Sequence, residues 1–282
     1  MNKKIVFSLI IITLCFIAFG CSNNNKEITF NTVDTEAVKA ALYDDNTVLV
    51  DTRLNDAFNG WKLDGVNRGG HIEGAVDFSA NWLKADTNNK DTQLNEALQT
   101  KGITTDKSII LYDSNDRDAK EVADYLSKKD YKNIAIYNVK PWTEDENLPM
   151  VSYPHYEKIM PAVAIKDLLD GKEVETFNQG KAIKIIEASW GEATESYDKG
   201  HIPMAIHINT DSIEPPPEWL LANDEQLKTF ALDYGFTKDD VVIVTGADQM
   251  AAYRVAVVLQ YIGISDVRVL NGGHPCLDNG WL

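Results

Sequence analysis

Cysteine and histidine are the residues of this chain that could carry nucleophilic or metal chemistry. The chain contains three cysteines and five histidines. A cysteine thiolate is a strong nucleophile and a metal ligand, whereas histidine serves as a general base or a metal ligand. Cys276 lies near the end of the chain, two residues after His274. The sequence leaves two interpretations open for Cys276: a reactive surface thiol, or an unreactive cysteine in a surface tail.

Two of the histidines occur in the same short motif. Residues 70–72 and 200–202 both read Gly-His-Ile. Either His71 and His201 belong to a structural unit that is built twice, or they are paired metal ligands. No Asp, Glu or His at ligand spacing accompanies either residue, and a protein metal site needs several ligands. We therefore expect turn residues of a repeated unit, and we expect no metal site and no cofactor.

Longer segments of the chain repeat as well, at an offset near 133 residues. Short β-rich apolar runs alternate with segments of helical periodicity in both halves. The corresponding segments are 48–53 and 184–189, 108–113 and 241–246, and 117–138 and 250–271. Residues 60–69 hold most of the extra length of the first half. Strands that alternate with helices predict an α/β fold, with one parallel sheet in each half that helices cover on both faces.

Specific motifs accompany this repeat. Asp51 and Arg53 form an Asp-x-Arg at the end of a strand, residues 70–75 read Gly-His-Ile-Glu-Gly-Ala, and residues 270–273 read Leu-Asn-Gly-Gly. Together these motifs resemble the rhodanese-like, or sulfurtransferase, family from about residue 28 onward. The resemblance implies two tandem rhodanese-like domains, each a parallel sheet flanked by helices, similar to multidomain secreted thiosulfate sulfurtransferases.

The resemblance also implies where sulfur chemistry would occur. In the family, a persulfide forms on a cysteine that opens the loop between the fourth strand and the next helix. Backbone N–H groups and the positive end of the helix stabilise the thiolate there. By motif position, the cysteine falls on Asp113 in the first half and on Gly246 in the second. The equivalent loop residues are Asp113, Ser114, Asn115, Asp116, Arg117 and Asp118, and Gly246, Ala247, Asp248, Gln249, Met250 and Ala251.

Neither loop begins with Cys, Ser or Thr. Asp113 and Asp116 place two carboxylates where an anionic sulfur donor would bind, and only Arg117 favours an anion. The second half also has Ser189 in place of the arginine of Asp-x-Arg. We therefore expect no catalytic residue in either loop. A thiol introduced at Gly246 is expected to have a lowered pKa, and the same change at Asp113 is expected to do less.

The first residues of the chain resemble a bacterial lipoprotein signal. Lys3 and Lys4 precede an apolar run, 5–19, which is too short for an ordinary membrane span, and Cys21 follows small residues. An ordinary secretory signal or membrane anchor is the alternative. We expect residues 1–20 to be removed and Cys21 to carry lipid, on the outer side of the cytoplasmic membrane or in the periplasm of a bacterial cell envelope.

The expected organisation follows: a tether at 21–27, a first rhodanese-like domain at 28–150 and a second at 151–282, with a stiff joint around 149–162. The formal charge of −16 argues against a nucleic-acid partner. Two functions remain open. One is a membrane-anchored, non-catalytic binding or scaffold module that takes a small anion or a protein at the strand-end loops. The other is a thiosulfate sulfurtransferase that acts through Cys276 or through a third domain absent from this chain.

Overall fold

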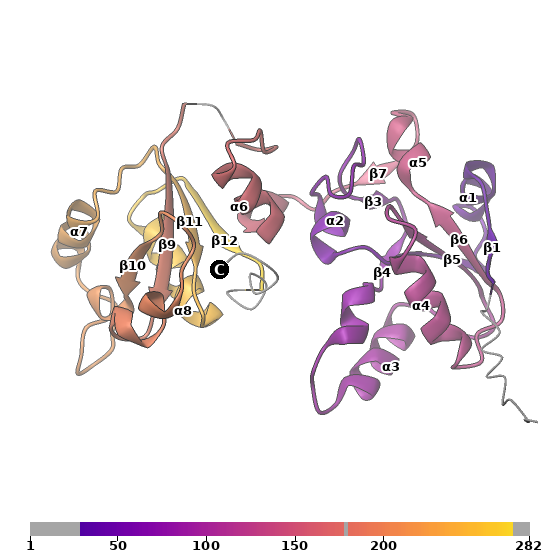
Figure 1. Ribbon diagram of the computed structural model, residues 1–282, viewed down its shortest axis with the longest axis horizontal. Coiled ribbons are helices and arrows are strands. Elements are labelled where there is room, and N and C mark those ends of the chain that lie inside the picture. The colour runs from indigo at the N-terminus through magenta and orange to yellow at the C-terminus, as the bar shows by residue number, and fades with distance from the viewer. Residues whose placement is uncertain (1–28, 178–179, 273–282) are drawn as a thin grey trace, which may run out of the picture.

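A computed structural model describes residues 29–177 and 180–272 of the chain. The predicted signal, Cys21, His274 and Cys276 lie outside these residues. The described chain forms two α/β lobes side by side, each built on a five-stranded sheet (Figure 1). No helix of the described residues is long and apolar enough to cross a membrane.

The first domain is a parallel sheet with strand order β1-β6-β5-β2-β4. Its strands are β1 (Asn31–Thr32), β2 (Thr47–Asp51), β4 (Val76–Asp77), β5 (Ser108–Asp113) and β6 (Ile134–Asn138). Its helices are α1 (Thr35–Ala41), α2 (Asn55–Asn59), the 3-10 helix η1 (Ala80–Lys84), α3 (Lys90–Thr100), α4 (Asp118–Ser127) and α5 (Lys140–Glu144).

Alternate residues of the buried strands face opposite sides of this sheet, as the two-residue period of a strand requires. Ile109 and Leu111 of β5 pack with α3 and α4 in one core cluster. Ile110 and Tyr112, their neighbours on the same strand, pack with α1 and α5 in another. Both faces of β5 are therefore buried, which explains why its sequence is a continuous apolar run rather than an alternating one.

The second domain repeats this topology strand for strand. Its sheet has the order β10-β9-β11-β12-β8 and is also parallel. The strands are β8 (Ile159–Met160), β9 (Ile183–Ser189), β10 (Ile206–Asn209), β11 (Val241–Thr245) and β12 (Asp266–Leu270). The helices are α6 (Ala162–Leu169), α7 (Asp224–Asp233) and α8 (Gln249–Tyr261), and short 3-10 turns η2 (Tyr156–Lys158), η3 (Ala193–Glu195), η4 (Tyr197–Lys199) and η5 (Thr210–Ser212) join them. The prediction of an α/β fold built twice is confirmed.

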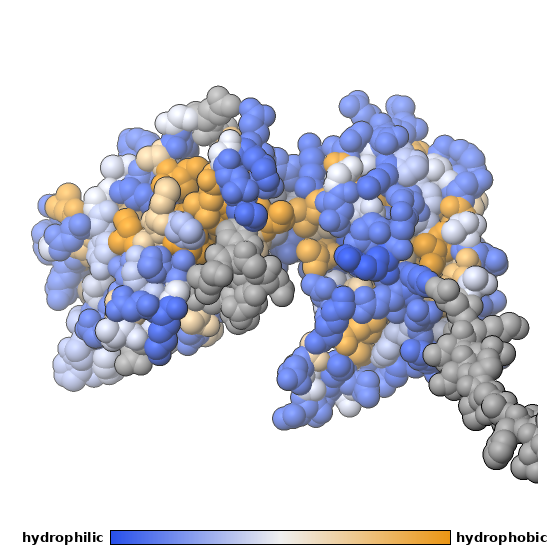
Figure 2. Space-filling view, in the orientation of Figure 1, coloured by the Kyte–Doolittle hydropathy of each residue, from blue (hydrophilic) through white to orange (hydrophobic). Residues whose placement is uncertain are grey.

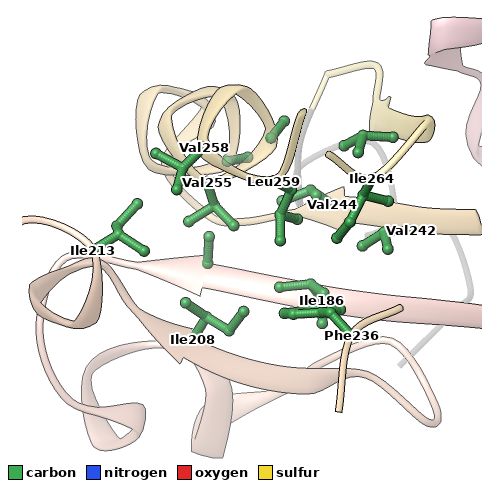
Figure 3. Close-up of a cluster of buried hydrophobic side chains, with 14 of the residues drawn as sticks. Ile186, Ile208, Ile213, Phe236, Val242, Val244, Val255, Val258, Leu259 and Ile264 are labelled. Atoms are coloured by element: carbon green, nitrogen blue, oxygen red, sulfur yellow. The ribbon is translucent and has the colours of Figure 1, made fainter. Parts of the chain in front are cut away.

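One face of the second sheet packs against α7 and α8. Val255 and Leu259 point from α8 toward the sheet, where they meet Ile186 and Val244 (Figure 3). Apolar residues on one side of α8 thus account for its position, because burying this side removes the apolar area from water.

The other face of the second sheet is completed by side chains of the first domain. Trp61 and Leu63, from the extra segment 60–69, belong to the same core cluster as Ile165 of α6 and Ile243 of β11. Hydrophobic residues accordingly gather where the two lobes meet (Figure 2). The extra length of the first half therefore serves to join the domains, which its sequence alone does not reveal.

The connection between the domains is also hydrogen-bonded to the first domain. β7 (Met150–Val151) pairs antiparallel with β3 (His71–Ile72), which is formed by the first Gly-His-Ile motif. Across the joint, the Asn271 amide donates to Asp56 Oδ1 at 2.8 Å. The connecting segment is therefore fixed to the first domain by a two-stranded sheet, and a separate side-chain hydrogen bond links the two domains.

Candidate functional site

The first loop, 113–118, runs from the carboxyl end of β5 into α4, where ligands of open α/β sheets usually bind. Asp113, which opens it, has a buried side chain. Its Oδ1 accepts the Asp116 N–H at 3.2 Å, and its Oδ2 accepts the Ala119 N–H at 2.9 Å. The carboxylate therefore occupies the backbone donors that would otherwise face an incoming anion.

Burial raises the pKa of Asp113, although the Ala119 and Asp116 N–H groups act to lower it. The nearby carboxylates of Asp118 and Asp116 raise this pKa further. Negative charge at this position is thus disfavoured overall, even with two amide donors directed at it. A second anion entering the first loop would meet the same burial and the same acidic neighbours.

The rest of the first loop is held by its own polar side chains. Asn115 Oδ1 accepts the N–H groups of Arg117 and Asp118, and its amide donates to Asp118 Oδ2 at 2.8 Å. Asp116 has a φ of 58°, a left-handed conformation that aspartate tolerates better than most residues. Arg117 is mostly exposed, with Nε 3.6 Å from Asp118 Oδ1. The one cation of the loop therefore points into solvent beside an acid.

Ser114 is the remaining member of the first loop. Its side chain is buried, and its hydroxyl donates a long hydrogen bond of 3.4 Å to Asp64 Oδ2. Asp64 belongs to the segment 60–69, so the loop contacts the same segment that joins the domains.

The second loop, 246–251, starts at the end of β11 and enters α8. Gly246 passes so close to β9 that a Cβ placed on it would lie 2.4 Å from the Ala188 carbonyl oxygen. The obstacle is backbone, so a side chain would displace a strand. The lowered thiol pKa expected at Gly246 stays a prediction, but a cysteine there would require the backbone to move, whereas Asp113 already has room for a side chain.

The remaining residues of the second loop cap α8. Asp248 Oδ1 accepts the Met250 N–H at 2.8 Å, and its Oδ2 accepts the Trp190 indole N–H at 2.6 Å. Gln249 donates to the Leu270 carbonyl at 3.0 Å. Ala247 and Met250 are exposed, whereas Ala251 is buried against the core. Asp248 thus takes up a helix-start donor, as Asp113 does in the first loop.

The Asp-x-Arg motif of the first half forms a buried ion pair. Arg53 donates through Nε and Nη2 to the two oxygens of Asp51, at 2.9 and 2.6 Å, and through Nη2 to the Gly70 carbonyl at 2.7 Å. Burial opposes the charge of Arg53, but attraction to Asp51 and its hydrogen bonds prevail and raise the pKa of Arg53. This arginine ties the strand end to the Gly-His-Ile motif through Nε and Nη2, while its buried Nη1 has no hydrogen-bond partner among the described residues.

The matching place in the second half has different chemistry. Ser189 replaces the arginine, and its hydroxyl lies 2.7 Å from Nε2 of His207. His207 comes from β10, paired in register beside Glu187, the counterpart of Asp51. The sequence alone indicates the serine but not the histidine, because only the pairing of β9 with β10 brings the two together.

The two Gly-His-Ile histidines have the same structural role in both domains. The His71 ring stacks on Phe58 at 3.8 Å, and its Nδ1 lies 2.8 Å from the Phe58 carbonyl oxygen. The His201 ring stacks on Tyr197 at 3.7 Å, with Nδ1 2.9 Å from the Tyr197 carbonyl oxygen. Each ring is packed against an aromatic residue of its own domain, which fits the structural interpretation of the repeat. Within 29–177 and 180–272, no three His, Cys, Asp or Glu side chains cluster as metal ligands would.

Known proteins resemble this chain in sequence and in architecture. The rhodanese-like domain family matches residues 34–139 and 168–275. The chain is 36% identical over 233 residues to the thiosulfate sulfurtransferase YnjE of Escherichia coli strain K12, covering 82% of this chain and 51% of that protein.

Solved structures of an anaerobic ergothioneine biosynthesis enzyme are also similar. The enzyme from Chlorobium limicola in complex with trimethyl histidine superposes with a TM-score of 0.77 and 28% identity, over 89% of this chain and 61% of that one. A variant of the enzyme EanB that carries a cysteine persulfide, with ergothioneine, gives a TM-score of 0.77 and 28% identity, over 89% of this chain and 62% of that one. The chain thus spans about half the length of the curated relative, and about three fifths of these structures.

Proposed function

Because the chain belongs to the rhodanese-like family of sulfurtransferases, as a tandem of two such domains, we propose that these domains form a non-catalytic binding module. Lipid on Cys21 would hold this module at a membrane. The recognition surface would be the strand-end loops, 113–118 and 246–251. Neither loop supplies a thiol, a hydroxyl or an imidazole at its first position, so neither can form the persulfide on which the family's chemistry depends.

The observation that carries this proposal is the Asp113 carboxylate. It holds the Asp116 and Ala119 N–H groups at 3.2 and 2.9 Å, which are the donors that a thiolate or an anionic sulfur donor would need. An anionic donor such as thiosulfate would have to displace a buried side chain of its own charge sign. The exposed acid of this loop, Asp116, favours a protein partner that presents N–H donors or cationic groups.

A second candidate function is thiosulfate sulfurtransfer. The 36% identity to a thiosulfate sulfurtransferase favours it, and Cys276 would be the nucleophile. That cysteine follows β12, whereas both strand-end loops precede a helix, so a Cys276 mechanism would use a different position from the family's loop.

The test is a thiosulfate and cyanide assay on the purified chain and on Cys276→Ser. We expect no thiocyanate above the protein-free rate from either protein, and no heat of thiosulfate binding by calorimetry. Turnover that Cys276→Ser abolishes would establish the second candidate. Turnover that survives Cys276→Ser would contradict both candidates and place the nucleophile elsewhere in the chain.

A further inference from the structure

The outward side of α8 is apolar, although a helix that covers a sheet normally shows polar residues to solvent. Met250, Tyr253, Val257 and Tyr261 have exposed fractions of 62, 37, 63 and 62%. They follow one another at spacings of three, four and four residues, so they lie along one side of the helix. We call these four residues the α8 outer stripe.

The first domain supplies an internal comparison, because α4 is the counterpart of α8. The four buried residues of α4 recur in α8 at the repeat offset: Ala119, Val122, Ala123 and Leu126 correspond to Ala252, Val255, Ala256 and Leu259, and α8 buries Ala251 and Val258 in addition. The outward residues are not alike. Where α8 has the outer stripe, the chain at α4 has Arg117, Lys120, Asp124 and Lys128.

The fold therefore does not require the stripe. The two helices share four buried residue types at matching positions, and the chain at α4 has charged residues at all four outward positions. Exposed apolar side chains that gather on one surface usually mark an interaction site. From this contrast, we infer that the α8 outer stripe docks against the α8 outer stripe of a second copy of this chain.

Charge favours a second copy as the occupant. Two copies of a chain with a formal charge of −16 repel each other over most of their surfaces. The outer stripe carries no charge, and the one charged residue of α8, Arg254, is paired with Glu214. The stripe itself thus brings no carboxylate into the contact, and the Asp224 carboxylate beside its end accepts a hydrogen bond from the Tyr261 hydroxyl at 3.3 Å. A membrane is a poorer match, because interfacial helices carry several Lys or Arg residues on their polar face.

The stripe is also complementary to itself. In an antiparallel pair of α8 helices, Met250 lies opposite Tyr261 of the other copy, and Tyr253 lies opposite Val257. The midpoint of each pair along the sequence lies within half a residue of position 255. A single two-fold axis through this position can therefore relate both pairs. Each pair places a large aromatic ring against a smaller or more flexible side chain, which suits close packing.

The apolar area of the α8 outer stripe limits the expected affinity of the dimer. A helix of 13 residues is about 20 Å long, so the stripe alone covers less than the roughly 800 Å² per partner of a standard interface. Trp219, Leu220 and Leu221 add exposed apolar surface in the segment that begins at Glu214, the partner of Arg254. We expect a weak dimer in the micromolar range or above. Because Met250 belongs to the second loop, the dimer would also cover that loop.

The experiment is sedimentation equilibrium of residues 21–282, expressed without the predicted signal that contains Cys15 and carrying Cys21→Ser and Cys276→Ser, so that neither lipid nor a disulfide links two copies. Between about 10 and 500 µM, the mass should rise from one chain toward two. The added substitutions Tyr253→Lys and Val257→Asp, which install the residues of α4, should leave a monomer at all these concentrations. Leu232→Lys, an exposed apolar residue of α7 outside the stripe, is the matched control and should dimerise like the parent.

Three outcomes would overturn the inference. One is a parent chain that stays monomeric at the highest concentration. Another is a dimer that survives the two α8 substitutions, provided circular dichroism shows that the variant is folded. The third is a monomeric parent that sediments with phosphatidylcholine vesicles only while the stripe is intact, which would assign the stripe to a membrane.

Discussion

Trp61 lies in the first domain by sequence but in the core of the second domain by packing. Its side chain is 2% exposed and shares a cluster with Met160, Ile165 and Ile243. Its indole N–H donates to the Ile159 carbonyl at 2.9 Å, and its ring meets Tyr156 edge to face at 5.6 Å. Trp61→Ala should therefore destabilise the second domain, although the substitution is made in the first.

The size of the effect follows from burial. Replacing a fully buried Trp by Ala costs about 3–5 kcal/mol, which includes the cavity that remains. Trp61→Phe keeps most of the apolar contact and loses the hydrogen bond to Ile159, so it should cost about 1 kcal/mol. Trp142→Ala is the matched control. Trp142 is equally buried, in the first domain's own core, and its indole N–H donates to the Pro149 carbonyl at 3.2 Å.

Native-state hydrogen exchange can separate the two domains, with the amides of β9 and β11 reporting on the second and those of β2 and β5 on the first. Trp61→Ala should lower protection in β9 and β11 by about 100-fold or more, since each 1.4 kcal/mol is tenfold. Trp142→Ala should lower hydrogen-exchange protection mainly in β2 and β5. If Trp61→Ala lowers protection only in the first domain, Trp61 does not stabilise the second core and the shared-core argument is wrong.

The remaining predictions concern the anchor and the two loops. Wild-type chain should require detergent for release from membranes, while Cys21→Ser should be soluble or unprocessed; fatty-acid label that persists in Cys21→Ser would contradict the anchor. Gly246→Cys should lower the melting temperature markedly, because its Cβ would meet the Ala188 carbonyl oxygen at 2.4 Å; an unchanged melting temperature would mean that the loop has room. Asp113→Cys should fold, and its thiol should titrate at or above the ordinary value of about 8.5, because burial already raises the pKa of Asp113 itself. Alkylation rates against pH measure this directly, and a thiol pKa well below that value would show that the loop still favours an anion.

Much of the fold was predictable because it depends on local pattern. The β-rich run predicted at 108–113 has the same limits as β5. The repeated segments 117–138 and 250–271 each contain a helix followed by a strand, α4 with β6 and α8 with β12. Repetition of these patterns at one offset was enough to predict two copies of one α/β domain, since strands that alternate with helices build a parallel sheet.

The loops were located from the sequence, but their chemistry was only partly predictable. The sequence itself shows that positions 113 and 246 carry no thiol. From the sequence, a thiol at Gly246 is expected to have a lower pKa than one at Asp113, because the second loop has fewer acidic residues. The closeness of Gly246 to the Ala188 carbonyl oxygen adds a steric obstacle that the sequence did not indicate, because it depends on the pairing of β9 with β11, between residues about 60 positions apart.

The sequence by itself determined the repeated fold, the residues of the two loops and the surplus length at 60–69. Only the tertiary structure decided what these features do: Asp113 takes the donors of its own loop, Ser189 meets His207 across two strands, and Trp61 enters the core of the other domain. Periodicity and composition are local properties, and they are readable along the chain. Contacts between distant residues depend on strand order and on the docking of one domain on another, and no local pattern records these.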